Sequence, residues 1–107
     1  EVFRKAVESL SESGMKLLGT CAVDVESIDW FIPHQANIRI INKVAEKLNV
    51  PDSKVIKCVH KHANTSAASI PLALHEGISD GKIHFGDRLL LQGVGGGLTW
   101  GSILMDL

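Results

Sequence analysis

Two apolar segments, each followed by polar side chains and then by a helical pattern, constrain the fold most. The first segment, 28–32, ends at Pro33 and leads into His34. The second, 55–59, leads into Asn64 and a further helical pattern. Short apolar runs rich in β-branched residues are typical of strands covered on both faces of a sheet. Strands that alternate with helices, and a chain that ends in two strands, predict a mixed α/β sheet with helices packed on it.

The helical pattern is clearest from Asn37 to Leu48, where apolar residues recur at intervals of three and four and Asn49 and Pro51 end the helix. The first helix is expected over 2–18, bent or split in two by Ser11, Ser13 and Gly14, and Asp24 is expected to cap a short turn after it. A further helix is expected after Asn64, which buries Ala67, Ile70, Leu74 and Ile78 and closes at Gly81. After a turn at Gly86-Asp87, the sequence predicts a strand over 88–92 and a glycine loop over 93–97. A final strand over 98–105 is expected to pair back as a hairpin.

Length and composition describe an ordinary globular domain. The 107 residues suffice for one domain, and the formal net charge of -1 gives no electrostatic case for binding nucleic acid or an anionic membrane. No apolar run reaches the ~20 residues that cross a bilayer. Cys21 and Cys58 form no CxxC pair, so we expect a reducing, cytoplasmic setting. The chain opens on a helix and does not begin with methionine, so we expect a processed or excised piece that lacks at least one earlier strand.

His34 and Asn64 are the strongest candidates for chemistry. Each follows a predicted parallel strand, and ligands bind at the carboxyl ends of such strands. An imidazole N–H and an amide NH2 that converge on one point would donate to a carbonyl oxygen gaining negative charge. The alternative is that His34 and Asn64 only cap local turns, since asparagine is a favoured helix N-cap.

Three segments carry a family resemblance. Ile32-Pro33-His34-Gln35-Ala36-Asn37-Ile38-Arg39, Asn64-Thr65-Ser66-Ala67-Ala68-Ser69 and Gly95-Gly96-Gly97-Leu98-Thr99-Trp100-Gly101 resemble the C-terminal signatures of β-ketoacyl-acyl-carrier-protein synthase III, in the same order and spacing. The similarity runs from about residue 24 to the end. It implies that residues 1–107 are part of the C-terminal half of a thiolase-like fold, a mixed α/β sheet with helices packed on it.

The resemblance also implies an activity, a decarboxylative Claisen condensation that starts fatty-acid synthesis. An acyl-cysteine formed from acyl-CoA, typically acetyl-CoA, would react with malonyl-acyl carrier protein, with no cofactor. His34 and Asn64 match two members of the family's Cys–His–Asn triad. Gln35, Ala36, Asn37, Ile38 and Arg39 match its contact with acyl carrier protein, where Arg39 would meet an acidic helix, and Gly95, Gly96 and Gly97 would let the backbone pass close to the substrate.

The third member of the triad is not in this chain. The family's nucleophilic cysteine lies at the start of a helix in the N-terminal half, whereas Cys58 is predicted within a strand and Cys21 within a connection. We therefore expect this chain to be inactive without the missing half. Ala63 replaces a usual glycine before Asn64, and Val94 replaces a frequent phenylalanine before the glycines, which weakens the prediction of activity.

Other interpretations of the same residues stay open. The glycine loop lacks the GxGxxG spacing of a dinucleotide site, and Cys58, His60 and His62 are a weak metal signal. A non-catalytic module that docks acyl carrier protein and a catalytically dead scaffold are the alternative functions. A half-fold would expose an apolar face, so we expect association, with a homodimer as the simplest form.

Overall fold

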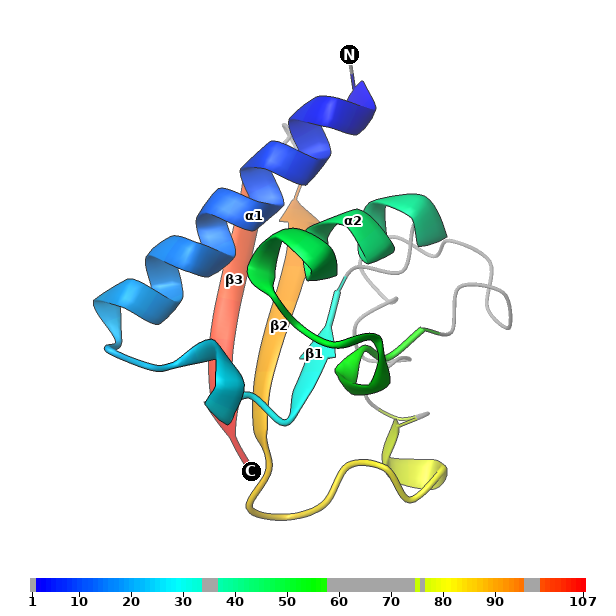
Figure 1. The fold of residues 1–107 in the computed structure, drawn as a ribbon. Helices are drawn as coiled ribbons and strands as arrows, with labels where there is room; N and C mark the ends of the chain where they lie inside the picture. The colour runs from blue at the N-terminus through cyan, green and yellow to red at the C-terminus, as the bar shows by residue number, and fades with distance from the viewer. Residues whose placement is uncertain (1, 34–36, 58–74, 76, 96–98) are drawn as a thin grey trace.

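The computed structural model describes residues 2–33, 37–57, 75, 77–95 and 99–107. Within these residues the sheet has three strands in the order β1-β2-β3: β1 spans Trp30–Ile32, β2 spans Arg88–Gly95 and β3 spans Thr99–Asp106 (Figure 1). β1 pairs with β2 in parallel, and β2 pairs with β3 as an antiparallel hairpin. The predicted mixed sheet and C-terminal hairpin are confirmed.

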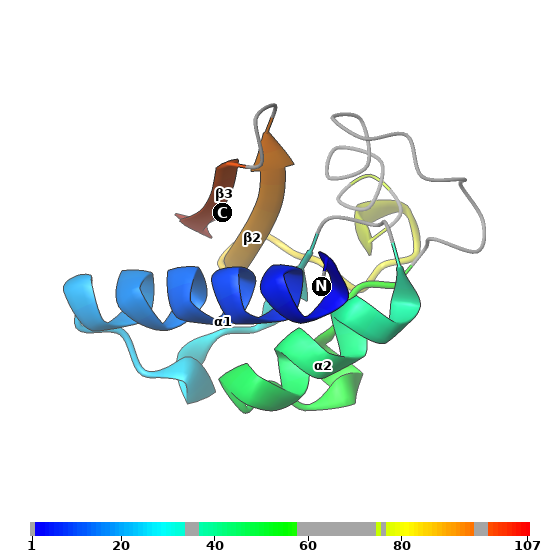
Figure 2. The ribbon, with the colours of Figure 1, turned by 90° about the horizontal axis from the view of Figure 1, so that it is seen from above.

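Two helices cover one face of this sheet. α1 spans Val2–Thr20 and α2 spans Ile38–Leu48, and both lie on the same side of the strands (Figure 2). The core beneath them includes Phe31 and Leu90, which are fully buried. A second cluster, which includes Ile32 and Leu89, occupies the opposite face because side chains alternate along a strand. The sheet is therefore apolar on both faces, as the sequence predicted.

α1 is one continuous helix, so of the two predicted alternatives, one bent helix or two short ones, the split at Ser11, Ser13 and Gly14 is wrong. These small residues let α1 approach its neighbours closely. A Cβ on Gly14 would lie 3.0 Å from Gln92 Nε2 and 3.1 Å from Leu48 Cδ2. Ser13 Oγ lies 2.8 Å from Ser102 Oγ on β3, within hydrogen-bonding distance. The residues that resemble a helix break therefore form a contact with the sheet.

Several predicted boundaries move. The strand expected over 28–32 is shorter in the structure, where β1 begins at Trp30. A 3-10 turn, Val25–Ser27, precedes it, and there the backbone carbonyl of Asp24, not its carboxylate, accepts the Ser27 hydrogen bonds. α2 begins and ends as predicted, with Asn49 in the left-handed conformation at its C-terminus. β2 runs on to Gly95, so the first part of the predicted glycine loop is strand, because it pairs with β3 as far as Thr99.

Two expectations lie partly outside the described residues. From the strand expected over 55–59, Val55 forms a parallel bridge with Phe31, and Ile56 N–H donates to Phe31 O at 3.0 Å. Of the helix after Asn64, residue 75 and residues 77–79 are helical. Gly81 closes that helix at φ +75°, as predicted. Ile78 is 52% exposed, which corrects its assignment to the buried face: Gly77 is the buried residue and packs on Ile83.

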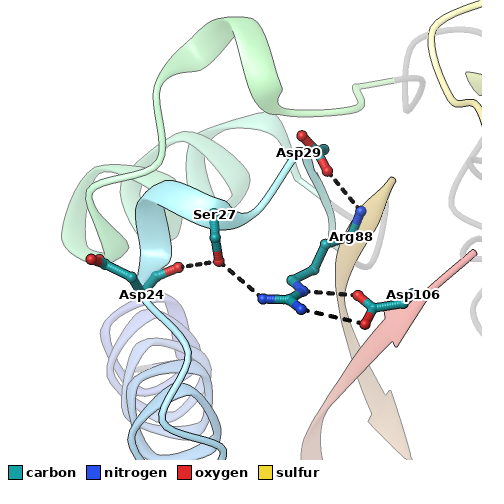
Figure 3. A network of polar contacts seen from close by, with 5 residues as sticks. All are labelled: Asp24, Ser27, Asp29, Arg88 and Asp106. Carbon is teal, nitrogen blue, oxygen red and sulfur yellow. Dashed lines mark hydrogen bonds and ion pairs between the residues drawn. The ribbon is translucent and has the colours of Figure 1, made fainter. Parts of the chain in front are cut away.

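A polar network joins the two chain segments at the amino ends of β1 and β2 (Figure 3). The Arg88 guanidinium donates to both carboxylate oxygens of Asp106, at 2.8 and 3.4 Å, and to Ser27 Oγ at 3.2 Å. The Arg88 backbone N–H donates to Asp29 Oδ2 at 2.8 Å. The hydrogen bond from Arg88, reinforced by its positive charge, lowers the pKa of Asp106. This network fixes the carboxyl end of β3 beside the amino ends of β1 and β2, at the opposite end of the strands from the predicted site.

Candidate functional site

The carboxyl ends of three parallel segments meet at one edge of the sheet. Ile32 at the end of β1 pairs with Leu91 of β2, and Val55 bridges to Phe31 from the other side. The chain leaves this edge through Pro33, directly before His34, and through Gly95, directly before Gly96. The edge is therefore of the kind that binds ligands in α/β proteins.

Most of the predicted site residues lie outside the described residues. This holds for both proposed oxyanion donors, for the first two residues of the carrier contact, for two of the three glycines, and for the alternative metal ligands and Ala63: His34, Gln35, Ala36, Cys58, His60, His62, Ala63, Asn64, Gly96 and Gly97. Gly95 is described as the last residue of β2. The side-chain convergence of His34 and Asn64 remains a prediction.

The described part of the predicted carrier contact forms the start of α2. Asn37 is the N-cap, and its Oδ1 accepts the Arg39 backbone N–H at 2.8 Å. This bond satisfies one of the free N–H groups of the first helical turn, so the Asn37 carboxamide has a structural role. Ile38 is 38% exposed, and Arg39 is exposed. Both side chains are therefore accessible to a partner, and their contact with a carrier remains a prediction.

Arg39 meets α1 at an aromatic ring. Its guanidinium carbon lies 5.0 Å from the centroid of the Phe3 ring, within the range of a cation–π contact. Phe3 is half-buried and packs against the core beneath the helices. This contact holds a cation at the junction of α1 and α2, two helices that are separated in the sequence and packed together in the fold.

An open groove runs between α1 and α2. Its lining consists of Phe3, Arg4, Val7, Glu8, Lys43 and Lys47. Three of these side chains are cationic and exposed, and Arg39 adds a fourth cation at the Phe3 ring. Two carboxylates oppose them: Glu8 in the groove, and Glu46, which pairs with Lys43 at 3.5 Å. We call this surface, Phe3, Arg4, Val7, Arg39, Lys43 and Lys47 with Glu8, the basic groove.

The basic groove was found only in part from the sequence. Lys43 and Lys47 share the polar face of the helix predicted over 37–48 with Arg39, whereas nothing in the segment 2–18 marks Phe3, Arg4 or Glu8 as site residues. Their pattern within the first helix signals an amphipathic element and nothing more. The packing of α1 beside α2 brings these two groups of side chains together.

A buried amide links α1 to the β2–β3 hairpin near the same edge. Gln92 is 1% exposed, and its Nε2 donates to Leu10 O at 2.7 Å and to Ser102 Oγ at 3.0 Å. Gln92 Oε1 and Ser11 Oγ have no hydrogen-bond partner among the described residues. This network connects the helix and both strands of the hairpin just before the glycines.

In the described part of the chain, the remaining features, a cysteine, possible metal ligands and apolar helices, give no further candidate site. Cys21 is an exposed free thiol just beyond α1, as expected of a residue in a connection. Within the described ranges, no three potential ligands gather into a metal site. None of the helices described there is long and apolar enough to span a bilayer.

A family model settles the relationship. The model for the C-terminal part of 3-oxoacyl-[acyl-carrier-protein (ACP)] synthase III matches residues 18–107. The chain belongs to this family. β-Ketoacyl-[acyl-carrier-protein] synthase III of Aquifex aeolicus is 51% identical over 105 residues, and that of Rickettsia akari is 57% identical over 105 residues. The resemblance drawn from the three sequence segments is confirmed.

The fold agrees with the family. The crystal structure of the Aquifex aeolicus synthase III superposes on 99% of this chain with a TM-score of 0.95 and 50% identity. The helices on a small mixed sheet therefore form part of a thiolase-like fold. The chain spans about a third of the length of its relatives, since 98% of it covers 34% of the Aquifex protein and 33% of the Rickettsia protein.

Proposed function

We propose that residues 1–107 form the C-terminal catalytic portion of a β-ketoacyl-acyl-carrier-protein synthase III, which starts fatty-acid synthesis in the cytoplasm. The observation that carries this proposal is the family match over residues 18–107 together with a TM-score of 0.95 to a synthase III. The whole enzyme would take an acyl-CoA and malonyl-acyl carrier protein as substrates, without a cofactor, and would act as a homodimer.

In the proposed reaction, a cysteine thiolate from the N-terminal half first attacks the thioester carbonyl of acyl-CoA, which forms the acyl-cysteine and releases CoA as its thiolate. The malonyl thioester then loses CO2, and the released electron pair forms an enolate. The enolate carbon attacks the acyl-cysteine carbonyl and expels the thiolate, which leaves a β-ketoacyl thioester on the carrier. His34 and Asn64 would stabilise the enolate oxygen by donating hydrogen bonds to it.

Three features support this assignment of His34 and Asn64. Pro33, which precedes His34, follows the carboxyl end of β1. Ile56 continues a parallel segment toward the same edge, on the way to Asn64. Gly95 ends β2 at that edge too. A catalytic constellation built from several strand ends is the usual arrangement in α/β enzymes.

A chimera tests this proposal without the natural partner segment. The C-terminal third of the Aquifex aeolicus synthase III would be replaced by residues 1–107, which superpose on it closely. We expect the folded chimera to decarboxylate malonyl-acyl carrier protein and to form the β-ketoacyl product. The Aquifex portion without residues 1–107 is the control. A folded chimera with no more activity than this control would contradict the proposal.

We also propose that the basic groove docks acyl carrier protein. The supporting observation is the excess of four cations over two carboxylates at the junction of α1 and α2. Complementary charge of this kind speeds encounter with an acidic partner and selects against basic ones. The docking proposal stands even if the site does not condense, since a non-catalytic carrier-docking module is the alternative function.

A further inference from the structure

Arg39 is held at its backbone by one contact and at its side chain by another. Its backbone N–H is fixed by the N-cap Asn37 at 2.8 Å, and its guanidinium lies over the Phe3 ring at 5.0 Å. Within the described part of the chain, no carboxylate forms an ion pair with this guanidinium. Phe3 itself is anchored, because it is half-buried against the core beneath α1. The ring is thus a fixed platform under an exposed cation.

Such a platform matters for a long, flexible cation. An arginine in solvent samples many rotamers, and a partner that binds it must pay the loss of that freedom. A ring that holds the guanidinium near its bound position reduces this loss. A guanidinium stacked flat on a ring also keeps its N–H groups free at the edge, where they can donate to a carboxylate.

We propose that Phe3 is a positioning residue for recognition of the carrier: it holds the Arg39 guanidinium at the α1–α2 junction, where it adds to Arg4, Lys43 and Lys47. This inference rests on the proposed docking of acyl carrier protein. It adds an aromatic residue from α1 to a contact that the family resemblance places in the segment from Gln35 to Arg39. The alternative is that Phe3 only fills space beneath α1.

The test is a double-mutant cycle in the full-length polypeptide that contains residues 1–107. Four proteins are compared: the wild type, Phe3→Leu, Arg39→Gln and the double variant. Their dissociation constants for acyl carrier protein are measured by titration at low salt. Leucine keeps an apolar group against the core but removes the aromatic ring. We expect Phe3→Leu to weaken binding by about 2- to 5-fold, the value of an exposed cation–π contact, and to have no effect when Arg39 is already glutamine.

Two further variants separate positioning from packing. Phe3→Trp retains a ring face and should restore affinity to within a factor of about two of the wild type. In a Lys47→Gln background, Phe3→Leu should keep its full effect, because Lys47 is not the cation on the ring. Thermal unfolding of each variant identifies any that fail to fold. If Phe3→Leu is one of these, the affinity of the Phe3→Trp variant for the carrier still tests the positioning role.

The outcomes are distinct. If Arg39→Gln and Lys47→Gln weaken binding but Phe3→Leu does not, or if Phe3→Leu weakens it equally with and without Arg39, the positioning role is wrong while docking stands. If the wild type does not bind the carrier, or if neither cation matters, both the docking proposal and this inference are overturned.

Discussion

Substitution of Gly14 by alanine tests why α1 lies where it does. Alanine in place of a helical glycine gains about 0.4–1 kcal/mol by restricting the unfolded chain. At Gly14 the new Cβ would lie 3.0 Å from Gln92 Nε2 and 3.1 and 3.2 Å from the two Leu48 methyl carbons. Neither neighbour yields easily, because the Gln92 amide donates two hydrogen bonds and Leu48 is 3% exposed.

Overpacking of this kind costs roughly 1–3 kcal/mol, so we expect Gly14→Ala to lower the free energy of unfolding by about 0–2.6 kcal/mol net. Gly19 in the same helix is the matched control, because nothing lies within 4 Å of a Cβ built on it. Gly19→Ala should stabilise the protein by up to about 1 kcal/mol. Denaturant unfolding of the full-length protein, with hydrogen exchange of the α1 amides as a local readout, measures both.

A second background sharpens this test. Leu48→Val removes the methyl groups nearest to the new Cβ, so Gly14→Ala should cost less in that background than in the wild type. If Gly14→Ala instead stabilises the protein as much as Gly19→Ala does, the close approach of α1 to Gln92 and Leu48 is not a real constraint.

Three further predictions concern charge and surface. Lys47→Glu should weaken binding of acyl carrier protein and Glu8→Gln should strengthen it, each by roughly 1.4- to 5-fold at low salt, since exposed ion pairs contribute about 0.2–1 kcal/mol. Titrations at high salt should erase both effects, and effects that persist there would refute an electrostatic origin. The lowered pKa of Asp106 means that its pairing with Arg88 stabilises the fold above the carboxyl's unfolded pKa, and that this stabilisation is lost as pH falls through the lower folded pKa. Asp106→Asn should therefore be less stable than the wild type at neutral pH and equally stable in strong acid. A difference in stability that grows on acidification would contradict this prediction. Ile103 and Met105 are 61% and 36% exposed on the same face as Leu89 and Leu91, so the isolated chain should associate in light scattering and Ile103→Lys should reduce this; a clean monomer at high concentration would contradict it.

The sequence predicts the elements with strong periodicity well. α2 is delimited within one residue because its apolar residues recur regularly, Asn37 caps its start and Asn49 its end. The mixed sheet follows from apolar strands that alternate with helices and end in a hairpin. These features depend on local patterns, and local patterns are what a single sequence displays.

The misjudged features depend on distant contacts. Gly14 resembles a helix break in the sequence, but in the structure Gln92 and Leu48 leave no room for a side chain at this position. Gly93 and Gly95 resemble a loop, but pairing with β3 keeps them in a strand. The basic groove likewise needs α1 beside α2, and neither helix alone indicates it. The predicted pair His34 and Asn64 follows from motif order and strand topology, and of the segments that precede these residues, β1 and Val55 run in parallel as expected.

Decarboxylation of malonyl-acyl carrier protein by the full-length protein, compared among the wild type, His34→Ala, Asn64→Ala and the double variant, tests the central claim most directly. We predict that each single substitution lowers the rate by about 10²–10³-fold, the effect of losing one oxyanion donor, while carrier affinity is unchanged. Because both donors act on one oxygen, the double variant should lose less than the product of the two single effects. Wild-type rates in folded His34→Ala and Asn64→Ala proteins would contradict the account.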